Sequence, residues 1–152
     1  MIIREVSFLD SDEIFNWRND INTRLMAKDF NKIDKKTHNK WFENCILNNN
    51  YELFLGMLDG VKVGVVWFIS DLKKKTAEVS INLNPSERGK NLSFILLKKS
   101  IDKFLEINSF TLHSTVKKKN LLSKTIFQKC NFKIKKSDKL YVYFFLETNK
   151  VK

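Results

Sequence analysis

The chain has 152 residues, 43% of them hydrophobic, and its 28 Lys and Arg outnumber its 17 Asp and Glu, which gives a formal net charge of +11. This length supports one sizeable core, and with only four Gly and one Pro the composition excludes long linkers and low-complexity tails. Two cysteines exclude a disulfide framework or paired-cysteine metal site, and no apolar run is long enough for membrane insertion. The charged start, MIIREVSF, does not read as a signal peptide. We therefore expect one cytoplasmic domain over residues 1–152, without a metal.

Hydrophobic periodicity predicts an alternation of strands and helices. The expected elements are a strand Ile2–Ser7, a helix capped by Asp10 or Ser11, an irregular stretch to Ile33, a helix from Asp34 to Leu47, strands Tyr51–Leu58, Val61–Ser70 and Lys75–Leu83, a helix after Asn91, a strand Thr111–Val116, a helix from Asn120, and a hairpin of Phe132–Lys136 with Leu140–Leu146. Because helices follow both Leu83 and Val116, the strands ending there are expected to be parallel. The prediction is a mixed α/β fold (α+β) with a mostly antiparallel sheet of about seven strands and about four helices.

A basic turn joins one predicted strand to the next helix. The strand ends at Leu83, Pro85 follows, and Glu87–Asn91 leads into a helix with apolar residues at helical spacing. The first amides of a helix have no partners inside it, and the helix dipole adds partial positive charge there. Arg88 and Lys90 are expected to add full charges. The sequence therefore predicts a site for phosphate or pyrophosphate at this turn.

The same turn resembles motif A of the GNAT superfamily of acetyl-CoA-dependent N-acetyltransferases, Gln/Arg-x-x-Gly-x-Gly/Ala. Arg88 matches the first position, and Asn91 and Ser93 replace the two small residues. Asn tolerates a left-handed backbone, and Ser permits close approach. The resemblance implies that two parallel strands splay apart and that acetyl-CoA enters between them, with an oxyanion donor at a backbone amide near Leu83. The cofactor-binding residues that it implies are Ile81, Leu83, Arg88, Gly89, Lys90, Asn91, Leu92, Ser93 and Asn120.

A later segment resembles the family pattern Val-x-x-x-Asn-x-x-Ala-x-x-x-Tyr-x-x-x-Gly-Phe. The matching residues are Val116, Asn120, Ser123 and Phe132. Phe127 stands where the family has a tyrosine that often protonates the departing thiolate. Catalysis is not excluded by this change, because a thiolate leaves tolerably well without a dedicated acid. Tyr51, Tyr141 and Tyr143 are alternatives for that role, and a non-catalytic binding module is the rival interpretation.

Two side chains are candidate general bases. Strand alternation places Glu78, Ser80 and Asn82 on one face. The apolar residues of the opposite face are expected to pack under the helix that follows Asn91. Glu78 can take a proton from the acceptor amine, or it can form a salt bridge to a lysine of the strand meander. His113, in the middle of its strand, is the second candidate, since histidine changes charge near neutral pH. A structural hydrogen bond is the alternative for His113.

The N-terminal segment indicates the acceptor. Trp17-Arg18-Asn19, Met26 and His38-x-x-Trp41 resemble the branch of the family that acetylates nucleotide-linked amino sugars, of the pseudaminic-acid pathway type. The resemblance implies that Trp17, Arg18 and Met26 bind the substrate. Trp17 alone could instead anchor the core, and His38 is expected to pack or cap rather than to catalyse.

The sequence thus predicts an N-acetyltransferase that acts on the amine of a nucleotide-linked deoxyamino sugar in polysaccharide biosynthesis. Acetylation of a protein N-terminus or ribosomal protein is the alternative enzyme, and an acyl-CoA- or nucleic-acid-binding module is the alternative outside enzymes. Nucleic acid is the less favoured partner, because the lysines are spread along the chain and clusters at turns are usually solvated. A homo-oligomer is possible, and a positive field suits anionic ligands.

Overall fold

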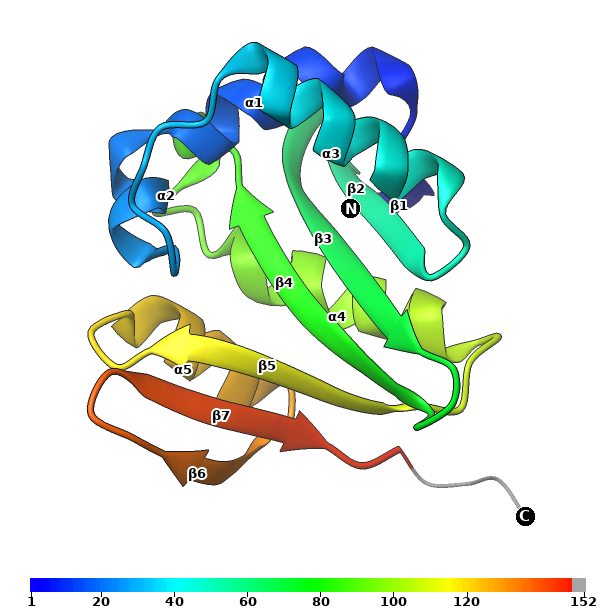
Figure 1. The fold of residues 1–152 in the computed structure, drawn as a ribbon, viewed down its shortest axis with the longest axis vertical. Coiled ribbons are helices and arrows are strands. Elements are labelled where there is room, and N and C mark those ends of the chain that lie inside the picture. Colours follow the sequence, from blue (N-terminus) through cyan, green and yellow to red (C-terminus); the bar gives the residue numbers. More distant parts are fainter. Residues whose placement is uncertain (149–152) are drawn as a thin grey trace.

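The computed structural model describes residues 1–148, which form one seven-stranded sheet with helices on both faces (Figure 1). The strands are β1 (Ile2–Glu5), β2 (Tyr51–Leu58), β3 (Val61–Asp71), β4 (Thr76–Leu83), β5 (Thr111–Lys117), β6 (Lys133–Ser137) and β7 (Tyr141–Leu146). The helices are α1 (Ser11–Asn19), α2 (Ile21–Met26), α3 (Lys35–Leu47), α4 (Leu92–Leu105) and α5 (Leu121–Lys129), with short 3-10 turns η1 (Phe8–Asp10) and η2 (Pro85–Glu87). The predicted fold class and strand number are confirmed.

Sheet topology follows from the connections. The strand order is β1-β2-β3-β4-β5-β7-β6, and every neighbouring pair is antiparallel except β4 and β5, which α4 connects. The parallel pairing covers only Thr76–Glu78 against Thr111–His113, although both strands continue beyond it. Figure 1 shows the two strands diverging after that point. The splay that the family resemblance implied is therefore present.

One helix was not predicted. The sequence indicated an irregular stretch up to Ile33, but Ile21–Met26 forms α2, so the described residues hold five α-helices rather than four. Asp20 caps this helix by accepting a hydrogen bond from the Thr23 amide at 3.0 Å. Its six residues are too few to show a helical periodicity over several turns, and none of them is buried.

Two cores lie on opposite faces of the sheet. The larger one packs α4 and α5 against the sheet and includes Ala77 and Val79 of β4. The smaller one lies under α1 and α3. Glu78, Ser80 and Asn82 alternate with the first set, so they face the side of α1 and α3, as predicted. We call this side of the sheet the acceptor side. Gly64 allows close approach, since a Cβ there would lie 2.9 Å from Leu96 of α4 and 2.7 Å from a β4 carbonyl.

Candidate active site

The gap between β4 and β5 is lined by backbone groups of β4. The Val79 carbonyl accepts a hydrogen bond from the Ser114 hydroxyl of β5 at 2.9 Å, so it points to the β5 side. The Asn84 amide donates to Val63 of β3 at 2.8 Å, so it points the opposite way. Since backbone groups alternate along a strand, the amides of Ile81 and Leu83 point toward the gap. These are the two strand amides that the sequence assigned to the cofactor.

The turn before α4 presents open backbone amides. Gly89 has φ +76° and Asn91 has φ +57°, so both occupy the left-handed region, as expected of Asn in place of the family glycine. Asn91 makes no side-chain hydrogen bond to the first turn of α4. In contrast, side chains of Asp20, Asp34 and Asn120 cap α2, α3 and α5. The first amides of α4, at Leu92 and Ser93, are thus free of a side-chain cap, which fits an anion.

The two cations of this turn, which the sequence predicts to bind the cofactor, are paired with carboxylates of the protein. Arg88 Nη2 donates to Asp20 Oδ2 at 2.7 Å and to Thr23 Oγ1 at 2.8 Å, which ties the turn to α2. Lys90 Nζ donates to both carboxylate oxygens of Glu87 at 3.0 Å. Both charges are therefore matched within the protein. Asn120 caps α5 by accepting a hydrogen bond from the Ser123 amide at 3.1 Å. The family resemblance implied cofactor binding for Asn120, and the cap gives this residue a structural role.

Glu78 and His113 meet at the point where the strands diverge. They are direct partners in the last paired position of β4 and β5, and paired side chains extend to the same face. The Glu78 side chain is 36% exposed and lies 3.7 Å from Lys28 Nζ. The salt-bridge alternative thus has a partner, although Lys28 lies after α2 and not in the meander. The fold brings both candidate bases to one place, at the start of the gap toward which the Ile81 and Leu83 amides point.

Arg18 and Trp17 have different environments. Trp17 is only 6% exposed and packs in the smaller core, which matches its alternative role as a core anchor. The guanidinium of Arg18 stacks 3.9 Å above the Trp41 ring, and burial lowers its pKa. No carboxylate among residues 1–148 lies within 4.0 Å of it. Met26 is 39% exposed at the end of α2. Arg18 is thus a partly buried cation without an anionic partner in the described chain.

His38 has a packing role, as the sequence indicated. It is fully buried between aromatic rings of α1 and α3, and its Nε2 donates to the Ser11 carbonyl at 3.0 Å. Its Nδ1 lies 3.5 Å from Arg18 Nη1 and accepts from it. Burial, followed by the charge of Arg18, lowers the pKa of His38 to about 4. The imidazole is therefore neutral at physiological pH, and it orients Arg18.

This burial predicts a pH-dependent stability. An unfolded histidine has a pKa of about 6.5, so between pH 6.5 and 4 the unfolded chain binds a proton that folded His38 does not. The stability contribution is complete above that window and falls as the pH decreases through it, by at most about 3 kcal/mol. We expect the melting temperature of the protein to drop between pH 7 and pH 5, and that of His38→Gln to drop less. Burial raises the pKa of Glu52, so the contribution of Glu52 to stability increases as the pH falls. Because Glu52 is present in both proteins, the difference between their curves isolates His38. Parallel curves would contradict the assignment.

The outer strands form an uncovered surface that adjoins the candidate bases. Tyr141, Tyr143 and Phe145 of β7 alternate with the buried residues Val142 and Phe144, so they extend to the acceptor side. Figure 1 shows α4 and α5 behind the sheet and, within the described residues, no helix in front of β5, β7 and β6. We call the three aromatic residues and their neighbours Lys133 and Lys136 on β6 the outer-strand face. Lys136 Nζ lies 4.8 Å from the centre of the Tyr143 ring.

The positive charge is concentrated in the same part of the chain. Residues 117–146 contain nine lysines and one acidic residue, a net charge of +8, whereas residues 1–116 carry +2. The lysines are spread along the chain as predicted, but the net charge is uneven, because the acidic residues are concentrated before residue 117. Of these lysines, Lys133 and Lys136 belong to the outer-strand face, so a ligand on that face lies beside positive charge.

Phe127 is a core residue. Its ring is 2% exposed and packs against Phe132 and Phe144, with centroids 5.0 and 5.9 Å apart. Among the alternatives for a hydroxyl donor, the Tyr143 hydroxyl donates to Asp138 at 2.8 Å. A tyrosine in the family position would therefore sit inside this core rather than extend from it.

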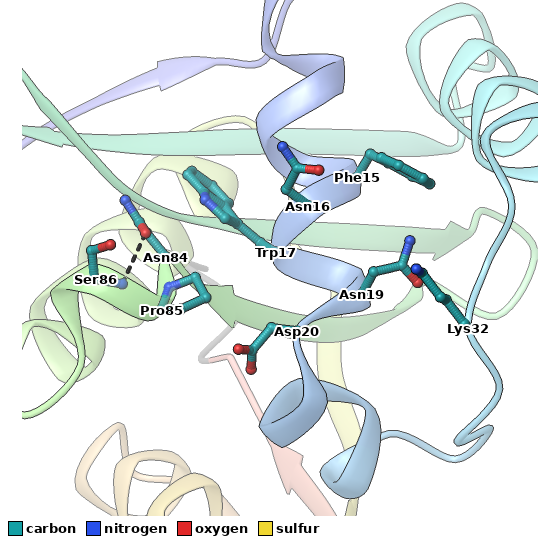
Figure 2. Close-up of a pocket in the computed structure, with 9 residues that line it drawn as sticks. All are labelled: Phe15, Asn16, Trp17, Asn19, Asp20, Lys32, Asn84, Pro85 and Ser86. Atoms are coloured by element: carbon teal, nitrogen blue, oxygen red, sulfur yellow. Dashed lines mark hydrogen bonds between the residues drawn. The ribbon is translucent and has the colours of Figure 1, made fainter.

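A hollow of about 470 Å³ lies between the end of α1 and the η2 turn. Figure 2 shows Trp17 and Asp20 on one side of it and Pro85 and Ser86 on the other. Trp17 is the only predicted site residue in its lining, and neither Glu78 nor His113 belongs to it. The pairing of β4 with β5 therefore locates the candidate chemistry better than this hollow does.

Several residues around the gap were not identified from the sequence. Ser114 holds β5 to β4 at the splay, Asp20 and Thr23 bind Arg88, and Lys28 contacts Glu78. Asp20-x-x-Thr23 is a helix-capping pattern that could have revealed α2. Asn82 is 7% exposed, and its Nδ2 has no hydrogen-bond partner among the described residues. Long-range contacts of this kind carry no local signal.

Comparison with solved structures reveals the fold in proteins of several specificities. A ribosomal-protein-alanine N-acetyltransferase from Brucella melitensis superposes with TM-score 0.82 at 16% identity, covering 97% of this chain and 100% of that one. The Campylobacter jejuni N-acetyltransferase PseH in complex with acetyl coenzyme A gives 0.75 at 22% identity, over 97% and 100% of the chains. Spermidine N-acetyltransferase from Vibrio cholerae, with CoA and spermine, gives 0.82 at 16% identity, over 95% and 94%. A search of curated protein sequences found no match.

Two features of the described residues bear on cofactors and membranes. No three His, Cys, Asp or Glu side chains are grouped so that they could hold a metal ion in residues 1–148. Within the same range, no helix has the length and hydropathy needed to span a bilayer.

The family model of the acetyltransferase (GNAT) family matches residues 11–132, which include the splayed strands and the turn before α4. The chain belongs to this family and is an acetyl-CoA-dependent N-acetyltransferase.

Proposed function

We propose that the enzyme transfers an acetyl group to the amine of a nucleotide-linked deoxyamino sugar. Acetyl-CoA supplies the acyl group as a reactive thioester. The amides of Leu92 and Ser93 are proposed to bind its pyrophosphate, and the amides of Ile81 and Leu83 its amide groups and the developing oxyanion. The acceptor approaches from the acceptor side of the sheet, the face away from α4, where Glu78 and His113 lie.

Proton removal is assigned to Glu78 or His113. Acetyl transfer requires a neutral amine, and either side chain can accept its proton directly or through water. Their direct pairing at the splay supports this proposal, because both side chains lie on the acceptor side where the gap begins. The acceptor is proposed to contact Trp17, Arg18 and Met26, of which Arg18 has the clearest chemical reason.

The observation that supports an anionic acceptor is the unpaired guanidinium of Arg18. It is partly buried and stacked on Trp41, and it has no carboxylate partner in the described chain. A cation held in this way is stabilised by a bound phosphate, and arginine suits bidentate phosphate contact. The +8 charge of residues 117–146 acts in the same direction. A polyamine, which is cationic, is disfavoured by both features.

A substrate panel with an Arg18 variant tests the proposal. Nucleotide-linked 4-amino-4,6-dideoxy sugars are expected to react faster than free amino sugars, spermine or peptides, because the diphosphate supplies binding energy that orients the amine. Arg18→Ala should raise KM for the sugar nucleotide about 10-fold to 100-fold, the loss of one charge-assisted hydrogen-bond pair. KM for acetyl-CoA should stay unchanged, and Arg18→Lys should give an intermediate value. Faster turnover of a peptide would instead support a protein acetyltransferase.

A further inference from the structure

The outer-strand face combines aromatic and basic side chains in a regular pattern. On the central strand β7, Tyr143 and Phe145 are flanked on one side by Lys136 and Lys133, their partners on β6. On the other side, Phe145 is paired with His113 of β5. Directly paired residues share one face of the sheet, so the rings lie between lysines and the candidate base.

Protection of the sheet edge explains only part of this pattern. Lysines on an exposed edge strand prevent pairing with another sheet, and β6 is such an edge. That function needs neither tyrosines on the neighbouring strand nor the shortage of acidic residues over residues 117–146. None of the nine lysines in this range forms a salt bridge with a carboxylate in the described chain. The face therefore suits a ligand with both aromatic and anionic groups.

The outer-strand face is continuous with the splay, and this continuity indicates which ligand the face binds. His113 links the face to Glu78, its partner on β4, where the acceptor amine is expected. Residues 141–145 of β7 extend over about 13 Å at the usual rise of a strand, which is enough for one nucleotide. A molecule whose amine lies at the splay can therefore cover the face with its remaining part.

We propose that the outer-strand face binds the nucleoside of the acceptor, with the base stacked on Tyr143 and Phe145 and with Lys136 and Lys133 beside its phosphate groups. The inference rests on the proposed function, since it names where that substrate's nucleotide lies. Arg18, which belongs to α1 and not to the outer strands, then contacts the diphosphate near the sugar. Stacking of a base on an aromatic side chain contributes about 1–3 kcal/mol, and each lysine adds screened attraction.

The ring of Tyr143 provides a matched pair of variants. Tyr143→Leu removes the aromatic surface, whereas Tyr143→Phe keeps it and removes only the hydroxyl that donates to Asp138. Calorimetry with nucleoside diphosphates carrying each of the four bases is performed with saturating coenzyme A, so that the cofactor site is blocked. We expect the best of them to bind the unmodified protein. Its Kd should rise about 5-fold to 100-fold in Tyr143→Leu and stay within twofold in Tyr143→Phe.

The outcomes separate this inference from the proposed function. If the sugar nucleotide is the preferred acceptor but Tyr143→Leu and Lys136→Met leave its KM unchanged, the nucleotide lies elsewhere and the inference is wrong. If nucleoside diphosphates bind through Tyr143 but the preferred acceptor lacks a nucleotide, the proposed function is wrong and the face remains a nucleotide site. Tighter binding of a single-stranded oligonucleotide or of anionic vesicles than of any nucleoside diphosphate would overturn the inference. Melting temperatures within a few degrees of the parent exclude misfolding of the variants.

Discussion

Gly89→Pro is expected to abolish coenzyme A binding. Gly89 has φ +76°, and proline fixes φ near −65°, so the substitution rebuilds the turn that leads to the first amides of α4. Proline also removes the amide of residue 89 itself. Because Arg88 and Lys90 are already paired with Asp20 and Glu87, few charges remain to hold the pyrophosphate once the amides are displaced. Isothermal titration with coenzyme A should give no measurable binding.

The chain offers a matched control for this variant. Gly60, in the β2–β3 turn, also has a positive φ of +80°, and at both glycines a Cβ would meet no atom within 4 Å. Gly60→Pro should therefore perturb a turn of the same kind and retain coenzyme A binding. Gly89→Asn, which keeps the amide and tolerates the left-handed region, should bind with affinity between those of Gly89→Pro and the parent. Unchanged affinity in a folded Gly89→Pro would contradict the site.

A related expectation concerns salt. If backbone amides bind the pyrophosphate within a generally positive field, affinity should weaken as ionic strength rises, because exposed charges are screened beyond about 8 Å at physiological salt. The same titration in low and high salt checks this. The effect should be smaller than for a site made of free lysines, since Lys90 donates to Glu87.

Local patterns in the sequence predicted most of the fold. Tyr51–Leu58 and the cap at Asp34 agree with β2 and with the start of α3, because alternation and capping act over a few residues. The parallel pairing of β4 with β5 followed from the helix between them. The helix α2 was missed, since it buries no residue and is held by contacts to Arg88 and Asn82 that are distant in sequence.

The candidate site was predicted less completely. Alternation placed Glu78 on the acceptor side, and His113 became its partner through a register that no local pattern specifies. The pairing of charges was not predicted. The sequence reading did not pair Arg88 with Asp20, because the start of α2 was missed, and it did not pair Lys90 with Glu87 of the same turn. The asymmetric charge of residues 117–146 could have been counted from the sequence, yet only the sheet shows that it borders Glu78 and His113.

Removal of the catalytic base should lower turnover strongly. General base catalysis contributes about 10²–10⁴-fold, so Glu78→Gln is expected to reduce kcat by a factor in that range while coenzyme A affinity is unchanged. Glu78 is favoured over His113 because its own strand carries the Ile81 and Leu83 amides, so the amine, the base and the oxyanion donors keep a fixed geometry. His113→Phe, by comparison, is expected to reduce kcat less.

Replacement of Lys28 distinguishes a catalytic role of Glu78 from a structural salt bridge. If the carboxylate only holds Lys28, then Lys28→Ala should reproduce the loss of turnover seen in Glu78→Gln. If Glu78 removes the amine proton, Lys28→Ala should have a small effect on kcat, and the acidic limb of the pH–rate profile should disappear only when the base is replaced. The measurement is steady-state acetylation of the best panel acceptor across pH in all three variants. An acidic limb that persists unchanged in both Glu78→Gln and His113→Phe would exclude both residues as the base.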